Sequence, residues 1–242
     1  MSKVTSQGLI IVCLFLVTWQ LLKQIDWMDV IGVEALTEKT EEKLGELYWD
    51  LFKTEGREST DEALHRRIDS LIEKICFHNQ INKTKIKLHI LEKDEVNAFV
   101  LPDGHLILFT GLIDFVENED ELSGVLAHEI AHMELSHVSQ KLIKEVGLST
   151  LISITTGGAG TEIIKETAFL LSSTAFDRSM EKEADLQAVT YMMNAGMSVE
   201  SFADLLSRMG KEDHQTASRY LSWISTHPDP NDRAAYILAY LN

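Results

Sequence analysis

The stretch VLAHEIAHMELSH, residues 125–137, places three histidines and two glutamates within one predicted helix. His128 and His132 are four positions apart, so a helix brings both imidazoles to one face, where they can bind one metal ion. Glu129 follows the first histidine, and this His-Glu-x-x-His arrangement is typical of zinc sites in which the glutamate is a general base. The alternative is a pair of core histidines that share a helix face by chance.

The other two candidate ligands of this stretch are expected on the far side of the helix. Glu134 is rotated by about 200° from His132, and His137 by about 180° from His128. The acidic residues at 119–121 favour a helix start there, and we expect one uninterrupted helix over residues 119–144. Such a helix keeps His137 away from an ion held by the other two histidines.

Two histidines leave a catalytic zinc ion one protein ligand short. The segment FDRSMEKEADLQAV, residues 176–189, offers Glu181, Glu183 and Asp185 on a second predicted helix. Glu181 and Asp185 are one turn apart, so the first can reach the metal and the second a ligand imidazole. Glu183 is about 200° from Glu181 and should face solvent. Geometry prefers Glu181 as third ligand, with Glu183 as its rival, and the alternative is a solvated acidic face.

The segments around these two helices predict an α+β fold that is mostly helical. Apolar periodicity indicates amphipathic helices at 34–56 and 60–78. A period of two then predicts three short strands, at 85–90, 97–101 and 105–109. We expect a small antiparallel sheet beside the zinc-binding helix, with the turn Pro102–Gly104 joining the last two strands. Residues 147–175 predict two short helices around a glycine hinge.

Composition limits the possible partners. Lys and Arg number 22 against 38 Asp and Glu, a formal charge of −16. Nucleic-acid binding needs a basic surface, so nucleic acid is excluded as a partner. The 2 cysteines cannot build a disulfide framework or a cysteine-based zinc site. The oligomeric state is not determined by the sequence.

The N-terminal segment is strongly apolar. Residues 8–22, GLIIVCLFLVTWQLL, would span about 22 Å as a helix, against a hydrocarbon core of about 30 Å. They fit a short membrane anchor, a signal peptide or a buried helix. No small-residue cleavage site follows them, which favours a retained anchor. We divide the chain into an anchor or signal segment (1–26), a helical N-terminal segment (27–58) and a domain that carries the predicted zinc site (59–242).

The motifs His128-Glu129-x-x-His132 and Arg178-x-x-Glu181-x-x-Ala184-Asp185 resemble those of one gluzincin metallopeptidase family. That family contains HtpX, the CAAX prenyl protease and the mitochondrial Oma-type protease. The likeness covers residues 60–240 and includes two further segments, NAFVLPDGHLILFTGLI (97–113) and THPDPNDRAAYI (226–237). This chain shows no membrane span after the zinc helix, so it is most similar to the compact branch with a single N-terminal anchor.

The resemblance implies a zincin-like fold and a role for each matched residue. One Zn²⁺ per chain would be bound by His128, His132 and Glu181, with Glu129 as the base. Asp185 would hold a ligand histidine, His227 would stabilise the oxyanion, and Arg233 would support the site. Asn97, Ala98 and Phe99 would form the strand at the rim of the cleft along which the substrate lies.

The implied activity is hydrolysis of peptide bonds by a zinc-dependent endopeptidase. Its substrates would be polypeptides, in particular misfolded or membrane-associated envelope proteins, so the implied role is protein quality control. The N-terminal segment would tether the catalytic domain to the membrane on the periplasmic, extracytoplasmic side. The alternatives are a chaperone-like peptide-binding protein that keeps the zinc fold but cleaves little, and a membrane-anchored structural adaptor.

Overall fold

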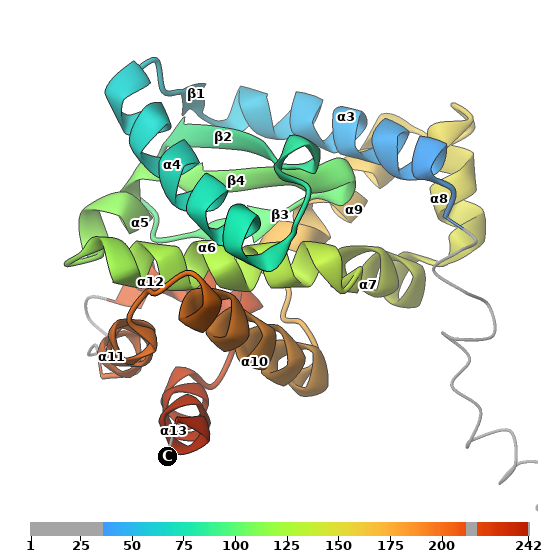
Figure 1. Cartoon of the computed structure of the whole chain (residues 1–242). Coiled ribbons are helices and arrows are strands. Elements are labelled where there is room, and N and C mark those ends of the chain that lie inside the picture. Colours follow the sequence, from blue (N-terminus) through green and yellow to red (C-terminus); the bar gives the residue numbers. More distant parts are fainter. Residues whose placement is uncertain (1–35, 212–216, 242) are drawn as a thin grey trace, which may run out of the picture. The chain divides into compact units, whose positions relative to one another are not determined.

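Helix α6 (Glu119–Glu134) lies at the centre of the described structure, a computed structural model that covers residues 36–211 and 217–241. Every residue of α6 from Glu121 to His132 is buried. The side chain of Asn118 caps the helix by accepting the backbone N–H of Glu121 at 2.9 Å, and three acidic residues occupy the first turn. In Figure 1, α6 lies between the small sheet and α10.

The remaining helices surround α6 and the sheet (Figure 1). Those before α6 are α3 (Glu38–Glu55), α4 (Glu62–Asn79) and α5 (Thr110–Phe115), and those after it are α7 (His137–Val146), α8 (Leu148–Thr155), α9 (Thr161–Ser173), α10 (Arg178–Asn194), α11 (Val199–Met209), α12 (Ala217–Thr226) and α13 (Pro230–Tyr240). Short 3₁₀ turns occur at Lys83–Lys85 and Pro102–Gly104. The expected fold class, α+β and mostly helical, is confirmed, as are the predicted helices near 34–56 and 60–78 and the two helices that flank the glycine hinge.

The sheet has four strands in the order β1-β2-β4-β3. They are β1 (Arg57–Glu58), β2 (Lys87–Glu92), β3 (Ala98–Val100) and β4 (His105–Phe109). The pairs β1–β2 and β3–β4 are antiparallel, whereas β2–β4 is parallel. The expectation of a purely antiparallel sheet was wrong for the pair β2–β4. After β2 the chain crosses to the far edge of the sheet and forms β3. The tight turn then brings it back as β4, between β2 and β3. This topology leaves β3 at the sheet edge.

The helix that carries His128 and His132 is shorter than the sequence predicted. Instead of running over residues 119–144, α6 ends at Glu134 and α7 begins at His137. Ser136 adopts a left-handed backbone conformation between them, with φ of 56° and ψ of 25°. This conformation cannot continue a right-handed helix, so the chain changes direction there.

Helix α11 packs closely against α6. A Cβ atom added at Gly124 of α6 would lie 2.5 Å from the Cβ atom of Phe202 on α11. Only the absence of a side chain at Gly124 permits this approach. The close packing fixes α6 from the side opposite the sheet.

Residues 37–242 form one compact unit, which includes α3. No helix among the described residues is both long and apolar enough to cross a membrane. The anchor or signal segment predicted at residues 1–26 lies outside the described residues, as does the first part of the helical segment predicted at 27–58.

Candidate active site

Two histidines of α6 converge at the heart of the site. The Nε2 atoms of His128 and His132 lie 3.0 Å apart, and both side chains are fully buried. They stand one helical turn apart on the same helix face, as their spacing predicts. Glu129, next to His128, is also buried, and its Oε1 atom has no hydrogen-bond partner.

Helix α10 brings Glu181, rather than Glu183, to these histidines. The Oε1 atom of Glu181 is 3.2 Å from His132 Nε2, and its Oε2 atom is 3.7 Å from His128 Nε2. The Glu181 side chain is 2 % exposed, whereas that of Glu183 is 62 % exposed. The helical angle predicts this difference, because the two residues project from opposite sides of α10.

His227, the residue directly after α12, belongs to the same cluster. Its Nδ1 atom lies 3.0 Å from Glu181 Oε1 and 3.2 Å from His128 Nε2, and its Nε2 atom lies 3.3 Å from Glu129 Oε1. One ligand atom from each of four residues lies within 4.8 Å of the others: His128, His132, Glu181 and His227.

A second layer of charged side chains supports these groups. Asp185 Oδ1 lies 2.9 Å from Nδ1 of His128, which directs the Nε2 atom of that imidazole toward the cluster. The Arg233 guanidinium donates from Nε and Nη2 to the Asp185 carboxylate, at 2.8 and 2.7 Å. Its Nη1 atom is 2.9 Å from Glu181 Oε2, and Tyr236 donates its hydroxyl proton to Asp185. Arg233 therefore links the carboxylates of two residues on α10.

His137 also belongs to this second layer, contrary to its expected position on the far side of a continuous helix. Its Nδ1 atom lies 3.1 Å from Nδ1 of His132, and its Nε2 atom lies 3.5 Å from Glu183 Oε2. The prediction was wrong because the left-handed conformation of Ser136 ends α6 and turns the chain back. The sequence ELSH carries no glycine or proline that would have indicated a break.

The charges of the cluster suit a divalent metal ion. Burial, followed by the positive charge of Arg233, lowers the pKa of His128 to about 4, and burial lowers the pKa of His132 to about 4 as well. Burial would raise the pKa of Glu181, but the neighbouring His227, Arg233 and His132 hold it well below its usual value. Two neutral imidazoles and one carboxylate are the ligand forms that zinc requires.

Glu129 has the opposite electrostatic environment. Burial raises the pKa of this carboxyl well above its ordinary value, and the charge of Glu181 adds to the rise, while Arg233 and Lys141 oppose it. A carboxylate with a raised pKa is a stronger base than an exposed one. The residue beside the ligand cluster is therefore the one whose environment favours taking up a proton.

The residues predicted to bind substrate lie at the edge strand β3. Asn97 O accepts from the Phe109 N–H at 3.1 Å, and the Leu101 N–H donates to His105 O at 2.8 Å. Because alternate residues of an antiparallel pair face the partner strand, the backbone groups of Ala98 and Val100 face away from β4. Both residues are buried, at 0 % and 4 % exposed, so this edge is covered in the structure. The Asn97 side chain is 2 % exposed, and its Oδ1 atom has no hydrogen-bond partner.

Comparison with known proteins places this arrangement in a family. Residues 58–240 match the profile of Peptidase family M48. The chain belongs to peptidase family M48. The match runs from the last residue of β1 to the end of α13 and thus includes both helices of the site, and it agrees with the resemblance seen in the sequence motifs.

Individual M48 relatives support the assignment over most of this chain. The mitochondrial metalloendopeptidase OMA1 of Schizosaccharomyces pombe is 28% identical over 179 residues, 72% of this chain and 52% of the relative. OMA1 of Bos taurus is 30% identical over 62% of this chain and 31% of its own length. The beta-barrel assembly-enhancing protease of Yersinia pestis is 25% identical over 89% of this chain and 47% of its own length. The chain thus spans about half the length of these M48 relatives, or less.

Proposed function

We propose that this chain is a zinc-dependent endopeptidase. The observation that carries the proposal is the convergence of His128, His132 and Glu181 next to Glu129, a carboxyl with a raised pKa. Metal ligands alone would suit a structural zinc site, but such a site has no need of a buried base beside it. Membership of a family of peptidases supports the same reading.

His128, His132 and Glu181 would hold the zinc ion, with Asp185 fixing the first imidazole. When bound, zinc supplies a Lewis acid that polarises a carbonyl group and makes water acidic enough to lose a proton near neutral pH. The protein contributes a dry, preorganised set of donors, since each of these side chains is at most 2 % exposed. Arg233 pairs with both carboxylates of α10 and so offsets part of the cost of their burial.

Glu129 and His227 would carry out the proton transfers and the charge stabilisation. Glu129 takes the proton of the attacking water at its carboxylate and passes it to the leaving amine nitrogen. His227 would stabilise the oxyanion that forms on the scissile carbonyl by donating from Nε2, in the form of the imidazole that carries a proton there; this atom lies 3.3 Å from Glu129 Oε1.

The substrate would be a polypeptide that lies extended along β3. The backbone groups of Ala98 and Val100 that face away from β4 would pair with it as an added strand, next to Asn97 and Phe99, once the side chains that cover this edge move aside. Pairing of this kind reads the main chain, so unfolded segments are suitable substrates. Two kinds of relative are named for beta-barrel assembly and for mitochondria, and on that ground we assign this chain to quality control of membrane-associated or envelope proteins.

The proposed cellular location depends on the N-terminal segment. Residues 1–26 would tether the catalytic domain to the membrane, with the domain on the periplasmic, extracytoplasmic side. The apolar run at residues 8–22 and the absence of a small-residue cleavage site after it support this proposal.

Glu129→Gln tests the proposal. The wild-type chain should contain one zinc ion and degrade casein, and the variant should keep its zinc and lose cleavage by about a hundredfold or more. Glu134→Gln is the matched control, because Glu134 is exposed at the end of the same helix, and it should cleave normally. A wild-type chain that binds zinc and casein without cleaving would instead support a chaperone-like binding protein.

A further inference from the structure

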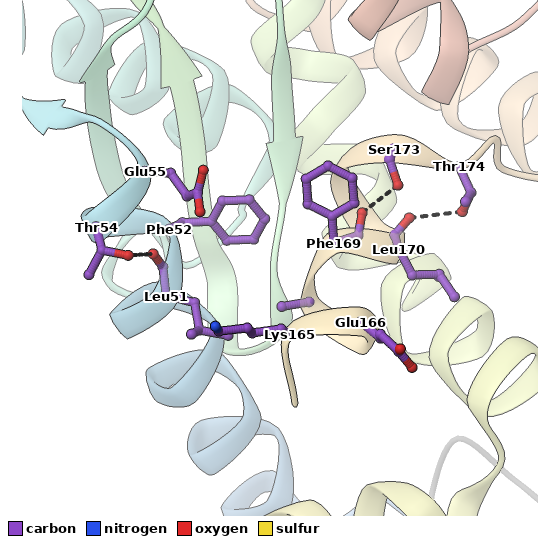
Figure 2. Close-up of a pocket in the computed structure, with 11 residues that line it drawn as sticks. Leu51, Phe52, Thr54, Glu55, Lys165, Glu166, Phe169, Leu170, Ser173 and Thr174 are labelled. Atoms are coloured by element: carbon purple, nitrogen blue, oxygen red, sulfur yellow. Dashed lines mark hydrogen bonds between the residues drawn. The ribbon is translucent and has the colours of Figure 1, made fainter. Parts of the chain in front are cut away.

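A groove between α3 and α9 lies beside the substrate-binding strand. It has a volume of about 610 Å³, within the range of small-ligand sites. Figure 2 shows Phe52 of α3 and Phe169 of α9 on its opposite walls. Leu51, Ala168 and Leu170 complete an apolar lining. Phe169 lines the groove and is 62% exposed.

The polar groups around the groove offer few hydrogen bonds to a ligand. The Thr54 hydroxyl donates to Leu51 O at 2.6 Å, that of Ser173 to Phe169 O at 2.6 Å, and that of Thr174 to Leu170 O at 2.8 Å. Figure 2 shows these bonds within the two helices. Since the hydroxyl protons are already donated to the backbone, the groove selects for apolar surface. The charged rim carries both signs, with Glu55, Lys165 and Glu166.

The groove continues to the edge of the sheet. A neighbouring pocket of about 540 Å³ shares Phe52, Glu55, Phe169 and Ser173 with it and extends to Asn97. Ser225, two residues before His227, lines the same pocket. Phe52 also packs on Phe99 of β3, with ring centroids 4.9 Å apart. A chain laid along β3 therefore has the groove within reach of its side chains.

The walls of the groove are held in place. The buried hydroxyl of Tyr48 on α3 donates to Thr167 Oγ1 on α9 at 3.0 Å. Ala168 and Leu171 anchor α9 in the core, each at most 2 % exposed. A groove whose walls are fixed before binding loses little entropy when it is filled.

We propose that the α3–α9 groove is a specificity pocket for one bulky apolar side chain, aromatic or branched, of the polypeptide substrate. Phe169 is the specificity-determining residue and Phe52 forms the inner wall. The inference rests on the proposed function, since the edge of β3 must carry the substrate. The pocket would select one side chain of a substrate whose main chain pairs with β3. Because bulky apolar side chains are buried in folded proteins, segments exposed only on unfolding would be the preferred substrates.

Binding and cleavage of two labelled peptides test the pocket separately from the proteolysis. The probes are fluorescein-labelled peptides of equal length and polar sequence that differ at one central position, Phe in one and Ala in the other. Binding is measured by fluorescence anisotropy with the full-length, zinc-loaded Glu129→Gln chain. The Phe peptide should bind about tenfold more tightly than the Ala peptide.

Substitutions of Phe169 test whether this residue causes the difference in affinity between the two peptides. Adding Phe169→Ala to the chain should bring the affinity ratio close to one, and Phe169→Leu should restore most of it. Phe77→Ala is the matched control, because Phe77 is 78% exposed on α4 and lines neither pocket, and it should leave the ratio unchanged. An unchanged affinity ratio in Phe169→Ala, or equal binding of both peptides by the parent chain, would overturn the proposed specificity pocket.

The wild-type chain then separates the two proposals. If it cleaves both peptides and Phe169→Ala abolishes its preference for the Phe peptide, both proposals are supported. If it cleaves neither peptide while the binding ratio still depends on Phe169, the pocket is supported and the proteolysis fails. If it cleaves both without preference, the pocket is overturned and the proteolysis stands.

Discussion

The Nδ1 atoms of His137 and His132 lie 3.1 Å apart, although the two residues belong to different helices. Glu183 Oε2 approaches the other nitrogen of His137 at 3.5 Å. If His137 donates its Nε2 proton to Glu183, its Nδ1 atom accepts the Nδ1 proton of His132. The Nε2 lone pair of His132 then points to the cluster, as metal binding requires.

Substitution of His137 should therefore weaken metal binding. His137→Ala removes the group that orients His132, and we expect zinc affinity to fall about tenfold to a hundredfold. Competition with a fluorescent zinc chelator measures it. Glu183→Gln is the graded control, since Glu183 is 62 % exposed and acts only through His137, and it should have a smaller effect. Equal zinc affinity in His137→Ala and the wild type would contradict this role.

Removal of Arg233 should destabilise the whole unit. Arg233→Met leaves the carboxylates of Glu181 and Asp185 buried without their cation, which costs about 3 to 5 kcal/mol of unfolding free energy. Urea denaturation measures it. Arg66→Met breaks the exposed ion pair with Glu62 and should cost less than about 1 kcal/mol. Similar losses in the two variants would show that Arg233 does not hold the buried charges.

The packing of α11 on α6 should depend on Gly124. Gly124→Ala places a Cβ atom against the backbone-proximal atoms of Phe202, and overpacking of this kind costs about 1 to 3 kcal/mol. Gly160→Ala is the control, because an added Cβ there meets nothing within 4 Å. Thermal unfolding compares the two. A Gly124→Ala variant as stable as Gly160→Ala would contradict the close contact.

Acid should destabilise the sheet through His105. Burial, followed by the charge of Lys87, lowers the pKa of His105 to about 4 from an ordinary 6.5, and its Nδ1 atom lies 2.9 Å from His89 Nε2. As the pH falls, the unfolded chain takes up the proton first. The free energy of unfolding is therefore highest above pH 6.5 and falls between pH 6.5 and about 4.

Urea denaturation at about pH 7 and about pH 4.5 measures this loss. The wild type should lose on the order of 2 kcal/mol more than His105→Gln, which has no titrating group at this position. His78→Gln, at an exposed position on α4, should behave like the wild type. Because all three chains share the proposed metal site, its own pH dependence cancels in the comparison. Equal losses in wild type and His105→Gln would contradict the effect.

Much of the arrangement around α6 could be predicted, because it depends on periodicity alone. One-turn spacing places His128 with His132 and Glu181 with Asp185, and the helical angle separates Glu181 from Glu183. His227 could not be placed this way. It meets His128 from 99 positions away, and only the resemblance to a family indicated it.

The features that escaped prediction depend on backbone geometry that leaves no mark on the sequence. The left-handed conformation of Ser136 moves His137 from the far side of a helix to a position against His132. The parallel pairing of β2 with β4 depends on where the chain crosses the sheet, and strand periodicity does not encode it. The groove between α3 and α9 required the packing of two helices that are distant in sequence.

The zinc content of variants at the proposed third ligand tests the central claim most directly. Zinc content per chain, determined by mass spectrometry of the dialysed protein, should be one in the wild type and in Glu183→Ala. It should fall to near zero in Glu181→Ala, while the circular dichroism spectrum of this variant should remain that of a folded chain. A folded Glu181→Ala chain that keeps one zinc ion, or a wild-type chain that binds none, would contradict the account.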